Sequence, residues 1–124
     1  MNQKTDHIDR EIEETSKVIR WVILQLKKKP LSEHELNAIH DLHFSGSLVR
    51  KKMGAWVQGT NYGNNKLEDH DNDTIKSLSD RKYIILTSHL WTERAFFTEH
   101  GRNISWVTGR AGVDRFGNQE GDAS

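Results

Sequence analysis

The stretch that decides the fold is Asp73-Thr-Ile-Lys-Ser-Leu-Ser-Asp-Arg-Lys-Tyr-Ile-Ile-Leu-Thr87. Ile75 and Leu78 are three residues apart, which puts both on one helix face, and Asp73 is a good N-cap. The pattern predicts a helix over 73–81 with this apolar pair directed inward. The polar side chains expected to point outward are Thr74, Lys76, Ser77 and Arg81.

The residues after this helix are typical of β-structure. Tyr83–Thr87 is rich in β-branched and aromatic residues, and Arg94–Thr98 is a second such run. Two runs this close favour a hairpin that turns within Ser88–Glu93. A short helix or turn is expected to follow over Glu99–Trp106.

Two helices are expected upstream. Apolar residues recur at helical spacing from about Thr5 to Lys29, and Pro30 ends that pattern. Ser32 and Glu35 then have the spacing of a capping box, so a second helix should begin there and run to Phe44.

The middle and the end of the chain are less regular. Leu48–Met53 is expected to be a third, short helix. Ala55–Asn72 is rich in Gly and Asn and is interpreted as a long loop. Gly109–Ser124 is polar and Gly-rich, so we expect a frayed end.

Two segments resemble winged helix-turn-helix proteins of the MarR/PadR kind. In that family a recognition helix with inward apolar residues leads through a short turn into an apolar strand, as Asp73–Ile84 does here, and the returning wing strand ends in an aromatic-x-Thr-x-x-Gly-Arg signature. Phe96-Phe-Thr-Glu-His-Gly-Arg102 is similar to that signature, and Ser47–Gly54 is similar to the first helix of the motif. The specific part of the resemblance covers 73–102.

The resemblance implies a mainly α fold with a small β-hairpin. It divides the chain into an N-terminal helix at 1–30, a winged-helix domain at 31–107 and a flexible tail at 108–124. The first helix and the C-terminal segment would then form a homodimer. The expected function is a transcriptional regulator that binds duplex DNA through the helix at 73–81 and a wing at 86–94, with no enzymatic activity and no cofactor.

A recognition helix reads base edges in the major groove, while phosphate contacts position the protein. Hydroxyl and cationic side chains suit these contacts. The residues expected to touch DNA are Thr74, Lys76, Ser77 and Arg81 on the helix, Arg50, Lys51 and Lys52 for phosphate, and His89 and Arg94 on the wing.

Composition excludes several other classes. The 124 residues carry 18 Lys and Arg against 18 Asp and Glu, so a uniformly basic coat is absent. There is no Cys, which excludes disulfide scaffolds and Cys-based zinc fingers. The longest apolar run, Trp21–Leu24, is far below the roughly 20 residues of a membrane span. No signal-peptide pattern opens the chain, so a cytoplasmic location is expected.

The charge is nevertheless distributed in blocks. Gly46–Lys66 contains four basic residues and no acid, whereas Leu67–Asp80 contains five acids against Lys76. The basic block favours phosphate contacts, and the acidic block opposes them.

Two alternatives remain open at the level of sequence. The first is a protein-binding module, such as a phage- or plasmid-type inhibitor or adaptor, which would use Trp91 and the 55–72 loop. The second is a metal-dependent enzyme built on some of the seven histidines, since His40 and His43 share a helix face. No metal-binding signature accompanies these histidines, so no metal site is expected. Trp91, at the tip of the hairpin, is expected to be exposed.

Overall fold

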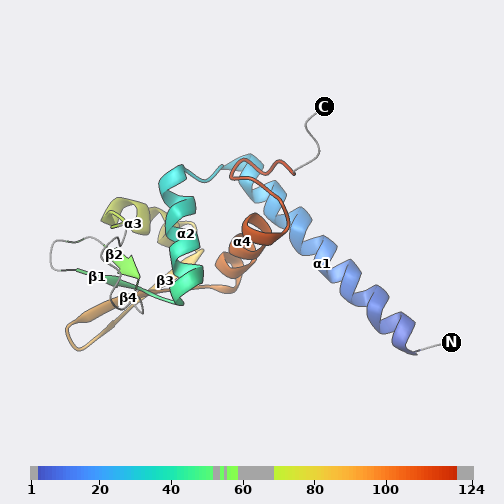
Figure 1. The fold of residues 1–124 in the computed structure, drawn as a ribbon, viewed down its shortest axis with the longest axis horizontal. Helices are drawn as coiled ribbons and strands as arrows, with labels where there is room; N and C mark the ends of the chain where they lie inside the picture. Colours follow the sequence, from blue (N-terminus) through green and yellow to red (C-terminus); the bar gives the residue numbers. More distant parts are fainter. Residues whose placement is uncertain (1–2, 52–53, 55, 59–68, 120–124) are drawn as a thin grey trace.

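The computed structural model describes residues 3–51, 54, 56–58 and 69–119, and within them the chain forms four helices and one antiparallel four-stranded sheet (Figure 1). Along the chain the elements are α1 (Gln3–Lys28), α2 (Glu33–Ser45), β1 (Leu48–Arg50), β2 (Trp56–Gln58), α3 (Asn72–Asp80), β3 (Ile84–His89), β4 (Thr92–Phe97) and α4 (Glu99–Arg110).

The first helix is a long rod that joins the body only near its C-terminal end. Val22 and Leu26 are fully buried, and the Trp21 ring stacks on His100 of α4 with 4.6 Å between centroids. The N-terminal half of α1 extends away from the rest of the molecule (Figure 1), and Ile12 is exposed there. The helix expected upstream of Pro30 is therefore confirmed.

The second helix begins and ends with the local signals that the sequence contains. The Ser32 hydroxyl accepts from the Glu35 backbone N–H, and the Glu35 carboxylate accepts from the Ser32 N–H, which confirms the capping box. Gly46 ends the helix in the left-handed conformation with φ of 82°, a region where glycine carries no steric penalty.

The predicted hairpin is confirmed and belongs to a larger sheet. β3 and β4 pair from Ile84↔Phe97 to His89↔Thr92, and the strand order is β2-β1-β4-β3. The mainly α expectation is therefore corrected to a mixed α and β fold.

The helix expected over Leu48–Met53 is wrong. Leu48 and Val49 instead form a strand beside Ala95 and Arg94 of β4. Pairing satisfies the edge of β4 that the hairpin leaves open, which outweighs a weak local helix preference. Within the expected 55–72 loop, β2 pairs with β1 and α3 begins at Asn72, while residues 59–68 lie outside the described part of the chain.

One core holds the helices against the sheet. Leu48 and Ala95 are completely buried on the sheet, as are Ile39 of α2, Ile75 of α3 and Ile104 of α4 on the helices. All of these belong to one continuous apolar cluster. The arrangement leaves the hairpin extending from the core with one end anchored (Figure 1).

The segment expected to be a flexible tail from residue 108 begins inside α4 and continues along the body. The Leu31 N–H donates to the Arg115 carbonyl, and the Arg115 guanidinium donates to the Leu31 carbonyl. Val113 is buried and forms an isolated bridge with Gln119. The chain therefore packs against the α1–α2 junction as far as Gln119.

Candidate nucleic-acid interface

Helix α3 turns most of its expected DNA-binding side chains toward the protein. Thr74 is buried beside Ile75, and the Ser77 hydroxyl donates to the Glu35 carboxylate at 3.1 Å. The Arg81 side chain is 6% exposed. The outward orientation expected for Thr74, Ser77 and Arg81 is therefore wrong, and Lys76 is the expected contact that does face solvent from this helix.

The reason for the inward turn is a polar cluster around Glu35. The Arg81 guanidinium lies 3.3 Å from the Glu35 carboxylate and donates to the backbone carbonyls of Lys29 and Pro30. Its guanidinium carbon also lies 5.0 Å from the centre of the Tyr83 ring. Arg81 thereby joins α2, α3 and the end of α1, which is a structural role that local sequence spacing does not indicate.

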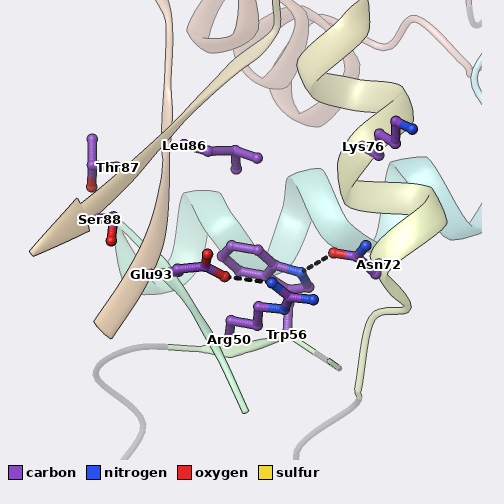
Figure 2. Close-up of a pocket in the computed structure, with 8 residues that line it drawn as sticks. All are labelled: Arg50, Trp56, Asn72, Lys76, Leu86, Thr87, Ser88 and Glu93. Atoms are coloured by element: carbon purple, nitrogen blue, oxygen red, sulfur yellow. Dashed lines mark hydrogen bonds and ion pairs between the residues drawn. The ribbon is translucent and has the colours of Figure 1, made fainter. Parts of the chain in front are cut away.

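A groove of about 380 Å³ separates α3 from the hairpin (Figure 2). Lys76 and Asn72 line it from α3, and Arg50 and Trp56 line it from β1 and β2. The hairpin contributes Leu86, Thr87, Ser88 and Glu93. The groove therefore combines cationic, hydroxyl, amide and aromatic groups from four separate segments of the chain.

Strand alternation places two of the hairpin's groove residues on one face of β3. Side chains on a strand alternate between faces, so Leu86 and Ser88 share that face, and Thr87 between them also lines the groove. Ser88 is paired with Glu93, which lies on the groove face too. The Arg50 guanidinium donates to the Glu93 carboxylate at 2.7 Å and thereby bridges β1 and β4.

The wing residues named from the sequence lie on the opposite face. His89 and Arg94 are offset by one residue from the groove-facing Ser88 and Glu93. The Arg94 guanidinium donates to the Ser47 hydroxyl at 3.4 Å. Neither wing residue lines the groove that holds Arg50 and Lys76.

The remaining basic residues lie beside the groove or outside the described chain. Lys51 forms an exposed ion pair with Asp69 at 3.3 Å. Lys52 lies outside the described residues. The structure therefore brings Arg50 and Lys76 into one groove, and it places Lys51 beside Arg50 in a second hollow that does not include Lys76.

Trp56, which precedes residues 59–68, is held at the floor of the groove by hydrogen bonds to residues that follow them. Trp56 and His70 exchange two backbone hydrogen bonds of 2.8 Å, and the Trp56 indole N–H donates to the Asn72 side-chain oxygen at 3.1 Å. Buried His70 lies 2.6 Å from the Asp41 carboxylate of α2. Trp56 is therefore fixed as a rigid apolar floor beneath Arg50.

The N-terminus of α3 is capped at the edge of the groove by Asp71 rather than by the expected Asp73. The Asp71 carboxylate accepts from the Thr74 backbone N–H at 2.7 Å. This bond, then the Thr74 side chain and nearby His34 and His70, lowers the pKa of Asp71 below its ordinary value of 3.8. The cap remains ionised at neutral pH and adds negative charge near the groove.

Trp56, Asn72, Ser88 and Glu93 were not among the site residues named from the sequence. A predicted register for the hairpin would have identified Ser88 and Glu93, because they pair with each other and each is adjacent in sequence to a predicted wing residue, His89 or Arg94.

The histidines do not gather into a metal site in the described part of the chain. No three His, Cys, Asp or Glu side chains converge there. His40 and His43 are exposed on α2, whereas His70 is buried against half-buried Asp41 of the same helix. No described helix is long and apolar enough to cross a membrane.

Comparisons with known proteins give no relative for this chain. No family model, no curated protein and no solved structure matches it. The inference of function therefore rests on the groove and on the arrangement of the elements around it.

Proposed function

We propose that this protein is a winged-helix regulator of transcription that binds duplex DNA across the groove between α3 and the β3–β4 hairpin. The observation that carries the proposal is the juxtaposition of Lys76, on the exposed side of α3, with Arg50 beneath the hairpin. The proposal is supported by the short helix α3 beside the two-stranded β3–β4 hairpin, with the third strand β1 on the far side of β4.

The electrostatics favour the groove over the helix surface alone. The solvent side of α3 carries Asp73 and Asp80 together with Lys76, so the helix by itself gives little attraction for phosphate. Arg50 adds a cation to the groove, and Lys51 lies beside Arg50 in the adjoining hollow. Both side chains are held in exposed ion pairs. Such pairs are worth about 0–1 kcal/mol, so a phosphate oxygen can replace the carboxylate at small cost.

The test is the affinity of labelled duplex DNA for the protein at low salt. Arg50→Ala combined with Lys76→Ala should weaken binding and reduce the slope of log affinity against log salt by about 0.9 for each lost phosphate contact. Lys17→Ala is the matched control, because Lys17 is an exposed cation on α1 in an ion pair with Glu13. Equal losses in both variants, or none in either, would remove the groove as the binding surface.

A second candidate, a protein-binding module, is supported by the other face of the sheet. Ile85 and Phe96 are register partners there, and both are exposed. A hollow of about 440 Å³ continues from Phe96 to Trp106 and Arg102 of α4. Ile85→Ser should abolish a protein complex that uses this face and should leave DNA affinity unchanged.

A further inference from the structure

The tip of the hairpin is the most exposed apolar feature among the described residues. Leu90 and Trp91 form the two-residue turn between β3 and β4. Leu90 is 80% exposed and Trp91 is 100% exposed. Neither side chain contributes to the core that holds the fold together.

The backbone of this turn is strained for its sequence. Leu90 has φ of 57°, in the left-handed region. Two-residue hairpin turns favour Asn, Asp or Gly there, because those residues adopt that conformation at little cost. The tip thus combines an unfavourable backbone with exposed apolar surface, and both features oppose stability. Departures of this kind from local preference are found at functional sites.

The surroundings of Trp91 identify the chemistry of a ligand. A hollow of about 470 Å³ next to it is lined by Arg50, Lys51, Ser88, Leu90 and Glu93 in addition to Trp91. The indole offers an aromatic face, while the two cations and the hydroxyl can bind phosphate oxygens. An aromatic platform beside cations is the combination that binds unpaired nucleotides.

We propose that Trp91 stacks on an unpaired base at a bulge or an overhang of the bound DNA, with Arg50 and Lys51 on the adjoining phosphate. This inference rests on the proposed function and adds a ligand class to it. A fully paired duplex exposes base edges in its grooves and hides the base faces in the stack. Trp91 therefore gains a stacking partner only where a base has left the stack.

The experiment compares two labelled DNAs of the same sequence, one fully paired and one with a single-base bulge. The wild-type protein should bind the bulged DNA about tenfold tighter, since stacking of one base on an aromatic side chain contributes on that scale. Trp91→Ala should remove this preference and leave the affinity for paired DNA unchanged. Trp91→Phe should retain part of it, and Leu90→Asn should retain all of it while relieving the turn.

Tryptophan emission gives an independent readout of stacking. Bulged DNA should quench the part of the wild-type emission that is lost in Trp91→Phe, and paired DNA should not. The proposal is overturned if the wild type binds both DNAs equally or if Trp91→Ala keeps the preference for bulged DNA. A protein is then the remaining candidate ligand for the hairpin tip. Binding of paired DNA that depends on Arg50 and Lys76 would survive that result, whereas absence of binding to either DNA overturns both proposals.

Discussion

Helices α2 and α3, called the α2–α3 layer below, and the β3–β4 hairpin place their polar and apolar side chains in opposite environments. In the layer, Glu35, Ser77 and Arg81 are turned inward and hydrogen-bonded to one another. On the hairpin, Leu90 and Trp91 are turned outward with nothing around them to bury their surface. Polar groups hold the layer together, while the hairpin exposes apolar groups that add nothing to the core.

The difference separates residues that maintain the fold from residues available to a ligand. If a nearly buried cation such as Arg81 loses its contact with Glu35, a buried charge is left without a partner, which is costly. An exposed pair such as Arg50–Glu93 can exchange partners freely. Changes in the layer should therefore alter stability, and changes on the hairpin side should alter binding.

The largest effect is expected from Glu35→Ala. The substitution leaves the Arg81 guanidinium nearly buried without its carboxylate and also removes half of the capping box. The free energy of unfolding should fall by about 3–5 kcal/mol, measured by chemical denaturation. Glu33→Ala is the matched control on the same helix, because the Glu33 side chain is exposed. Similar losses in the two variants would contradict the layer's dependence on this cluster.

A smaller loss is expected from Gly101→Ala at the start of α4. A Cβ atom there would lie 1.7 Å from the Tyr83 carbonyl oxygen and 2.9 Å from the Phe97 ring. The backbone must shift to relieve this overlap, so unfolding should become easier by about 1–3 kcal/mol. Gly109→Ala, in the same helix with open space around it, should be neutral or stabilising. A stable Gly101→Ala protein would show that α4 does not pack this closely on Tyr83 and Phe97.

Asp71→Ala should have an intermediate effect that depends on pH. Loss of the N-cap should lower stability by about 1 kcal/mol at neutral pH. Because the folded pKa of Asp71 lies below its unfolded value, its contribution is complete above the unfolded pKa and disappears as pH falls through the folded pKa. Denaturation curves of wild type and variant should thus converge in acid. A constant gap between pH 7 and pH 2 would contradict the role of the ionised cap.

Trp91→Ala should leave stability nearly unchanged. The side chain is fully exposed, so its removal opens no cavity and should shift the free energy of unfolding by less than about 0.5 kcal/mol. Leu90→Asn should raise the free energy of unfolding by a few tenths of a kcal/mol or more, since Asn tolerates the left-handed conformation of the turn. Strong destabilisation by Trp91→Ala would mean that the tip packs against the protein.

The sequence predicted the elements that local signals control. Ser32 and Glu35 mark the start of α2, and the apolar residues around Ile84 and Phe97 predict the hairpin. The three-residue strands β1 and β2 were missed because their partners on β4 and on each other, rather than their own side chains, determine them. Strands this short contain too few residues for an alternation of apolar and polar side chains to be recognised in the sequence.

The site was predicted less well than the fold, for the same reason. Arg81 and Glu35 are 46 residues apart, so their pairing has no local signature. Thr74 was expected outside, but it lies four residues before Leu78 and therefore shares the buried face of α3 with that residue. Lys76 and Arg50, both predicted DNA contacts, line one groove, whereas strand alternation places Arg94 on the other face of the sheet.

The most direct test of the proposed function is to map backbone amide signals by NMR while paired duplex DNA is added. The account predicts shifts concentrated at Arg50, Asn72 and Lys76 and along the groove side of the hairpin, with α1 unaffected. Shifts confined to the Ile85–Phe96 face, or no shifts at low salt, would contradict DNA binding in the groove.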